Sequence, residues 1–127
     1  RLLSNGGKMV ICDADFSKGT LKCSADDPLS IASASFVKSH VTDPHLLTKV
    51  KSLVSNVGFV IENFEVTSRV VTGNGMRMWV ETAVKGMVER NEIGGALADA
   101  LVAEYDRRVK NESLYGFLPF FTFIVKK

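Results

Sequence analysis

The chain has 127 residues, of which 46% are hydrophobic and 24% are charged, a composition that excludes disordered and collagen-like proteins. The formal net charge of +2 neither requires nor excludes a nucleic-acid partner, because clustering of charge on one face decides that. No apolar run approaches the ~20 residues of a membrane helix, and no signal peptide is visible. We therefore expect a single domain, residues 1–127 with a loosely ordered lead-in at 1–7, in the cytoplasm or elsewhere inside the cell.

The first part of the chain predicts a β-hairpin. Residues 8–12 and 20–24 are short β-type runs, and Gly19 between them can adopt a positive φ. Cys12 and Cys23 would then face each other across the hairpin. Two cysteines without CxxC spacing indicate free thiols in a reducing compartment, and a cross-strand disulfide is the alternative.

Two Asp-Pro pairs predict the starts of two helices. In Asp27-Pro28 and Asp43-Pro44 the aspartate can cap a helix, and the proline can take the first position, where a missing N–H costs nothing. The first helix, residues 28–39, is rich in serine and has a thin apolar stripe. The second, ending near residue 56, has apolar residues at helical spacing.

A β-rich segment precedes the clearest helix of the chain. Residues 59–72 are rich in β-branched and aromatic side chains and predict one bent strand or two strands divided near Glu62. Residues 76–90 then predict a helix with one apolar face that contains Trp79.

A second helix and an apolar strand complete the chain. The helix covers residues 97–109, and residues 114–127 predict a strand in which Pro119 marks an edge, a bulge or the start. The element order predicts an α+β fold: a small mixed or antiparallel sheet of the N-terminal hairpin, one or two central strands and the C-terminal strand, packed against about four helices.

Two carboxylates follow an apolar run. Asp13 and Asp15 come directly after MVIC, and paired carboxylates at a strand end suit Mg²⁺-dependent phosphotransfer. Together with Ser17 they partly resemble the DxDx(T/V) motif of the haloacid-dehalogenase phosphohydrolases, and the resemblance implies that one carboxylate attacks or ligates while the other ligates or moves a proton. Ser17 stands where this motif has Thr or Val, and no aspartate follows Lys110. The alternative is an acidic turn, where Asp is common.

A glycine-rich turn lies between the central strand and the clearest helix. Backbone amides at such a position, here Gly73, Asn74 and Gly75, can cradle a phosphate. The turn lacks the third glycine of a dinucleotide fingerprint and the Lys-Ser/Thr of a P-loop, so a plain tight connection is the alternative. No His or Cys spacing matches a metal site, and we expect no metal and no cofactor.

Basic residues are densest near the C-terminus. They are Arg107, Arg108, Lys110, Lys126 and Lys127. If the last helix ends beside the last strand, they form a patch that can contact a phosphate backbone. Glu104 and Asp106 interleave with the arginines, so a solvated surface is the alternative.

The C-terminal strand has almost no polar face. Its phenylalanines are Phe117, Phe120, Phe121 and Phe123. In a sheet with one solvent-exposed face, every second side chain of this strand would point into water, so either helices or a partner chain must cover both faces of the strand. We predict a homo-oligomer, most simply a two-fold dimer, with these phenylalanines at or just beneath the contact.

The sequence favours a non-enzymatic binding or self-assembling structural module, of viral or other origin, with a weak nucleic-acid contact through the basic residues. The alternative is a Mg²⁺-dependent phosphotransfer or phosphate-binding domain that uses Asp13, Asp15 and the Gly73–Gly75 turn. We favour the first because the second lacks partner residues for a complete mechanism.

Overall fold

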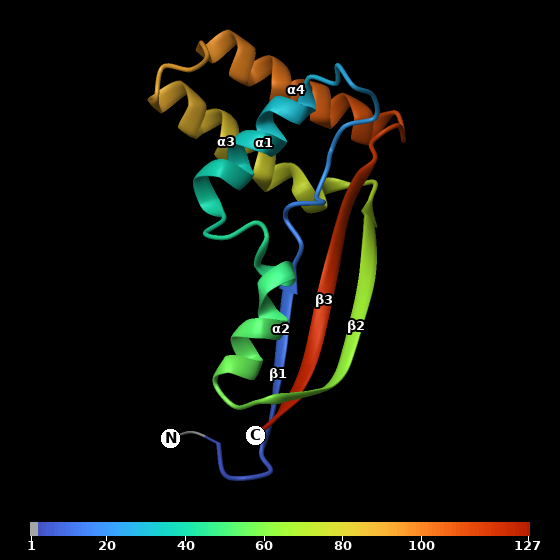
Figure 1. The fold of residues 1–127 in the computed structure, drawn as a ribbon. Helices are drawn as coiled ribbons and strands as arrows, with labels where there is room; N and C mark the ends of the chain where they lie inside the picture. Colours follow the sequence, from blue (N-terminus) through green and yellow to red (C-terminus); the bar gives the residue numbers. More distant parts are fainter. Residues whose placement is uncertain (1–2) are drawn as a thin grey trace. The chain divides into compact units, whose positions relative to one another are not determined.

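The computed structural model describes residues 3–127, and within this range four α-helices accompany a three-stranded antiparallel sheet (Figure 1). The predicted α+β class with a small sheet is confirmed. The strand order is β1-β3-β2, so the C-terminal strand is central. The elements are β1 (Lys8–Ala14), α1 (Leu29–His40), α2 (Leu46–Asn56), β2 (Val60–Val71), the 3-10 turn η1 (Asn74–Met76), α3 (Arg77–Glu89), α4 (Gly95–Lys110) and β3 (Gly116–Lys126).

The contacts divide the chain into two compact units, and each is described by itself. The sheet unit contains the described residues up to Lys18, together with Asp43–Arg69 and Leu118–Lys127. It includes β1, α2 and most of β2 and β3. The helical unit contains Gly19–Thr42 and Val70–Phe117, and with them α1, α3 and α4. That the chain forms a single domain stays a prediction.

The predicted N-terminal hairpin is wrong. β1 pairs antiparallel with β3, from Lys8 opposite Lys126 to Ala14 opposite Phe120, and Thr20 makes only an isolated bridge. The physical reason is that an isolated hairpin is marginal, whereas β3 offers β1 a long apolar partner. Cys12 therefore lies opposite Thr122 in the sheet rather than opposite Cys23, and both cysteines are free.

The first residues of the described chain are joined to its end. Gly6 donates its N–H to the Lys127 carbonyl at 3.1 Å, and the Lys127 N–H donates to the Gly7 carbonyl at 3.0 Å. The expected loose lead-in at residues 1–7 is therefore held at its C-terminal side, and residues 1–2 lie outside the described range.

One helix and one face of β3 form the core of the sheet unit. Val50 and Val54 of α2 pack with Phe121, Phe123 and Val125 of β3, and all five are buried. Alternation places these three β3 residues on the same face of the strand. α2 begins at Leu46 with His45 at its N-cap position, two residues after the predicted cap Asp43, whose carboxylate accepts the His45 N–H at 3.0 Å.

The helical unit is built from the apolar stripes that the sequence predicts. α3 and α4 correspond to the two helices expected near residues 76–90 and 97–109, and their buried residues recur at helical spacing. Trp79 is only half-buried and stacks on Phe36 of α1, with ring centroids 4.7 Å apart. Within residues 3–127, no helix is long and apolar enough to cross a membrane.

Candidate functional site

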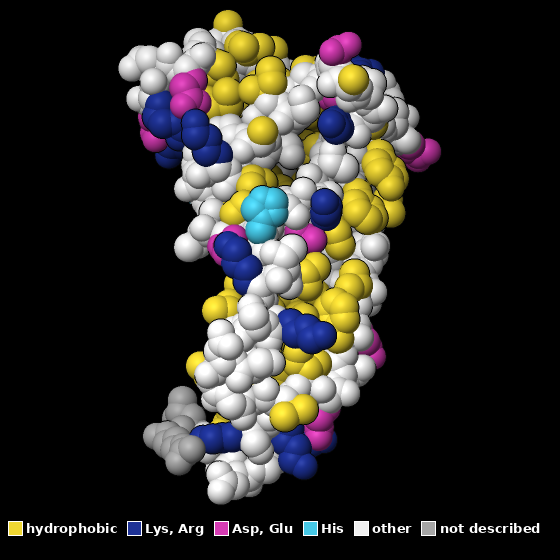
Figure 2. Space-filling model, viewed as in Figure 1, with side chains coloured by type: hydrophobic (Ala, Val, Ile, Leu, Met, Phe, Trp, Pro, Cys, Tyr) yellow, Lys and Arg dark blue, Asp and Glu magenta, His cyan; other side chains and the backbone are white. Residues whose placement is uncertain are grey.

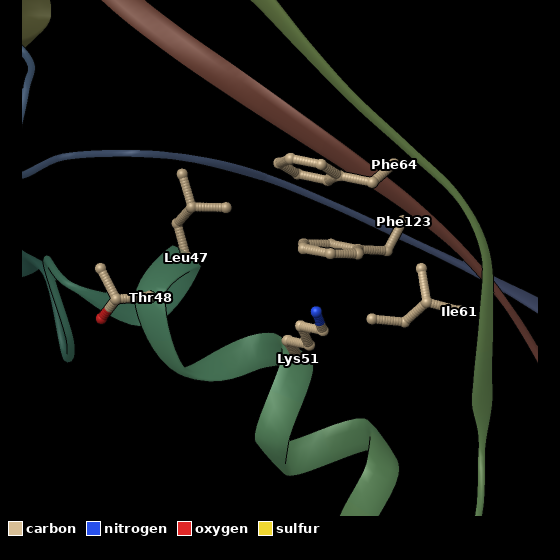
Figure 3. A pocket seen from close by; sticks show the side chains of 6 residues that line it. All are labelled: Leu47, Thr48, Lys51, Ile61, Phe64 and Phe123. Carbon is tan, nitrogen blue, oxygen red and sulfur yellow. The ribbon is translucent and has the colours of Figure 1, made fainter.

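A groove of about 540 Å³ opens in the sheet unit between α2 and β2 (Figure 3). It is lined by Leu47, Thr48 and Lys51 of α2, Ile61 and Phe64 of β2, and Phe123 of β3. Figure 2 shows hydrophobic side chains open to solvent alongside α2 on this face of the sheet unit. The groove therefore exposes apolar walls that a folded core would normally bury.

Two side chains of β2, Ile61 and Phe64, reach the groove. Ile61 and Phe64 are three residues apart, so strict alternation would place them on opposite faces. Between them, the Asn63 side-chain oxygen accepts the Phe64 N–H at 2.9 Å, and both Ile61 and Phe64 line the groove. Phe64 then stacks on Phe123 with ring centroids 4.5 Å apart. β2 is one strand, Val60–Val71, so of the two predicted alternatives the division into two strands near Glu62 is wrong.

Lys51 is the charged group of the groove. It lies one helical turn after Leu47, and Figure 3 shows its side-chain nitrogen directed toward the space between Phe123 and Ile61. Within residues 3–127 Lys51 makes no ion pair, whereas Lys49 on the same helix pairs with Asp43 at 2.7 Å. The groove thus combines apolar walls with one uncompensated positive charge.

The second open feature of the sheet unit is the outer edge of β1. The Asp15 N–H donates to the Pro119 carbonyl at 2.9 Å, in register with the β1–β3 ladder. By alternation, the backbone groups of Ile11 point toward β3, and those of Val10 and Cys12 point to the outer edge. The Val10 side chain is 63% exposed. The strand order leaves this edge without a neighbouring strand in the described chain.

The two predicted acidic candidates are hydrogen-bonded locally, Asp13 within the end of β1 and Asp15 in the turn that follows it. Asp13 is exposed and accepts the Ala14 N–H at 2.7 Å. Asp15 is buried, and its carboxylate accepts hydrogen bonds from the N–H of Ser17 at 3.1 Å and from its hydroxyl at 2.6 Å. Over residues 3–127, no group of three or more His, Cys, Asp and Glu side chains is placed to hold a metal ion.

The Gly73–Gly75 turn is fixed by a tyrosine from α4. The Tyr105 hydroxyl donates to the Gly73 carbonyl at 2.7 Å and accepts the Met76 N–H at 3.2 Å. Burial raises the pKa of the Tyr105 hydroxyl above its ordinary value. One of the amides that follow the turn is therefore already hydrogen-bonded. The sequence signal for this anchor is a tyrosine on the apolar stripe of α4, since a buried Tyr hydroxyl usually finds a partner.

The basic residues divide between the two units. Arg107, Arg108 and Lys110 belong to the helical unit, and Lys126 and Lys127 to the sheet unit. That they form one patch stays a prediction.

Arg108 is buried rather than presented to solvent. Its guanidinium donates to both carboxylate oxygens of Asp27, at 2.6 and 3.0 Å, and to Glu104 at 2.6 Å. Burial disfavours the charged form of Asp27, but the hydrogen bonds from Arg108, Cys23 and Leu29 outweigh it and lower the pKa of that carboxyl. Hydrogen bonds from Arg107 and then Arg108 lower the pKa of Glu104 to about 2. The arginine and Asp27 are thus part of the helical unit's interior.

The phenylalanine candidates separate by burial. Phe121 and Phe123 are 0% and 4% exposed and belong to the core under α2. Phe117 and Phe120 are half-buried, and the Arg69 guanidinium lies 5.3 Å from the centre of the Phe120 ring. On one face of β3, the strand is therefore covered by a helix, α2, rather than by a partner chain.

No family model matches the chain, and no curated protein matches it. A solved structure described as Haemonchus contortus phospholethanolamine N-methyltransferase 2, in complex with phosphomonomethylethanolamine and S-adenosylhomocysteine, is similar at 16% sequence identity with a TM-score of 0.39. The match covers 100% of this chain and spans 28% of the length of that one. Similarity at this level supports no conclusion about fold or activity.

Proposed function

We propose that the chain is a self-assembling module that joins a second copy of itself through the outer edge of β1. The observation that carries this proposal is the combination, on one edge strand, of unpaired backbone groups at Val10 and Cys12 with an exposed Val10 side chain. An edge of this kind is a ready template for another strand. The module is non-enzymatic in this proposal.

The two edges of the sheet differ in the way that the proposal requires. Proline and charged side chains usually keep an edge strand from pairing. The four residues of β1 between Lys8 and Asp13 contain neither. β2, the other edge, carries Glu62, Glu65 and Arg69. The outer edge of β1 is therefore the one suited to accept a strand.

A two-fold antiparallel pairing of β1 with the β1 of a second copy, centred on Ile11, uses the backbone groups that point to the outer edge. It places Val10 of one copy opposite Cys12 of the other, and these are the residues whose backbone groups point outward. The Val10 side chain gains a cross-strand neighbour in place of water.

The proposal places the module inside the cell, because Cys12 and Cys23 are free, exposed thiols of the kind that a reducing compartment preserves. Arg107, Lys110, Lys126 and Lys127 remain candidates for a weak nucleic-acid contact. The phosphotransfer alternative stays a prediction, and the local hydrogen bonds of Asp13 to Ala14 and of Asp15 to Ser17 do not favour it.

Size-exclusion chromatography with light scattering tests the proposal. At tens of micromolar, above a dimer dissociation constant of ~10⁻⁵ M, the chain is expected to elute as a dimer. Val10→Pro removes one outward N–H without touching the β1–β3 ladder, and it should give a monomer with an unchanged circular-dichroism spectrum. Val10→Ala keeps the N–H and should remain a dimer.

A monomeric unmodified chain would contradict the proposal, as would a dimer that survives Val10→Pro. If Val10→Pro does not fold, Val10→Lys replaces it, because a lysine on an edge strand blocks pairing while it keeps the backbone intact. A folded Val10→Lys that still dimerises overturns the proposal equally.

A further inference from the structure

The groove between α2 and β2 has the size and lining of a small-molecule site. Its volume of about 540 Å³ falls in the usual range of ~300–1,000 Å³ for ligand sites. Four of its six lining side chains, Leu47, Ile61, Phe64 and Phe123, are apolar. Phe64 is 47% exposed, so the stacked ring presents a large apolar surface to solvent at the groove.

The charge of the groove points to an anionic ligand. The five side-chain carboxylates of the sheet unit within the described range have other partners. Asp13 is hydrogen-bonded at the end of β1 and Asp15 in the turn that follows, Asp43 pairs with Lys49, Glu62 pairs with Lys8, and Glu65 accepts a hydrogen bond from the Asn63 amide. Lys51 therefore has no carboxylate from its own unit. An anion at the groove would supply one.

The apolar surface continues past the groove along β2. Val66 is two residues beyond Phe64, so alternation places both on the same face of the strand, and Val66 is 52% exposed. A flexible alkyl chain can follow such an open strip, whereas a compact anion such as phosphate would use only Lys51. The extended shape favours a chain-like ligand.

We propose that this groove binds a free fatty acid, with its carboxylate at Lys51 and its alkyl chain along Phe64 toward Val66. Lys51 supplies the charged hydrogen bond, and the ring pair of Phe64 and Phe123 supplies the apolar floor. This site is separate from the outer edge of β1, since β1 and β2 are opposite edges of the sheet.

Titration of the full chain with decanoate, followed by ¹H–¹⁵N correlation NMR, tests the proposal. Decanoate should shift the amide signals of Lys51, Phe64 and Val66 in a saturable manner. Acetate, which carries the same head group without the chain, should shift none of them at the same concentration. A chain that shows no saturable decanoate shifts at these residues contradicts the proposal.

Two lysine variants on the same helix separate a specific contact from general charge. Lys51→Met keeps the length and apolar character of the side chain and should weaken decanoate binding about fivefold, as for an exposed ion pair of ~1 kcal/mol. It should leave binding of the uncharged 1-decanol unchanged. Lys49→Met removes a lysine that is already paired with Asp43 and should leave decanoate binding unchanged.

Equal losses of decanoate binding in the two lysine variants would show attraction to general positive charge and overturn the proposal. So would a Lys51→Met chain that binds decanoate as tightly as the unmodified chain. Val10→Pro should not affect decanoate binding, so a failure at the groove can be distinguished from a failure of assembly at β1.

Discussion

The two units of the chain are stabilised in different ways. The core of the sheet unit consists of apolar contacts between α2 and β3, its ion pairs, such as Lys8 with Glu62, are exposed, and the carboxylate of its buried Asp15 accepts hydrogen bonds from within its own turn. The helical unit adds buried polar contacts to its apolar core. Arg108 with Asp27 and the Tyr105 hydroxyl each join segments that are far apart in the sequence.

This difference indicates where each unit can interact with other molecules. In the helical unit the buried polar groups fix the segments to one another, because an unsatisfied group there would cost free energy. The sheet unit instead leaves strand edges, a half-exposed phenylalanine and an unpaired lysine in contact with solvent. Both of our proposals therefore concern the sheet unit.

The largest expected effect comes from the core of the sheet unit. Phe121→Ala removes a fully buried ring and should lower the free energy of unfolding by about 3–5 kcal/mol in urea. Phe120→Ala is the matched control on the opposite face of β3, where the ring is half-buried, and it should cost less than half as much. Equal losses would mean that burial on the two faces of β3 does not differ as described.

The same variant tests whether the two units form one domain. Trp79 is the only tryptophan and lies in the helical unit, so its fluorescence follows that unit alone. If the chain unfolds as a single cooperative domain, Phe121→Ala should shift the fluorescence midpoint and the circular-dichroism midpoint together. A fluorescence midpoint that does not move would show that the units unfold separately.

The second prediction concerns the buried pair of the helical unit. Arg108→Met leaves the Asp27 carboxylate buried without its partner and should cost about 3 kcal/mol, the lower end for such pairs. Arg107→Met is the matched control, because that neighbouring arginine makes only an exposed pair with Glu104. We expect no measurable change in the urea midpoint for it. If Arg108→Met were as harmless, the pair with Asp27 would not stabilise the unit.

The sequence predicts the contacts that repeat along a helix and misses those that join distant segments. The stripe of Val80, Ala83, Val84 and Met87 follows from a period of 3.6 residues, and all four are buried. Asp27 is predicted as the cap of the first helix; α1 begins one residue later than predicted, with Pro28 at its N-cap position, and the Asp27 carboxylate accepts the Leu29 N–H at 2.9 Å. Signals of this kind are local, so a single sequence contains them.

Two failures show the limit. The pairing of β1 with β3 joins opposite ends of the chain, and no local pattern distinguishes it from a hairpin between neighbouring runs. Arg108 shares its segment with exposed charges, so composition places it on the surface, whereas its partner Asp27 lies 81 residues away. The groove was missed for the same reason, because its walls come from three separate elements.

The smallest expected effect is the response of the helical unit to acid. The pKa values of Asp27 and Glu104 lie below their ordinary values of 3.8 and 4.5, so the unfolded chain takes up protons before the folded chain does. Their contribution to stability is therefore complete above those ordinary values and is lost as the pH falls toward about 2, the pKa of Glu104.

At pH 3 this loss is only partial, because the folded Glu104 carboxylate, with a pKa of about 2, is still largely ionised. The urea midpoint followed by Trp79 fluorescence should therefore fall modestly between pH 6 and pH 3. Asp27→Asn is already less stable at pH 6, since an amide cannot replace the charge beside Arg108. Asp27→Asn should lose less stability on acidification, so the urea midpoints of the unmodified chain and of this variant should converge. If the gap between unmodified chain and variant stayed constant or widened toward pH 3, the lowered pKa of Asp27 would not contribute to the stability of the helical unit.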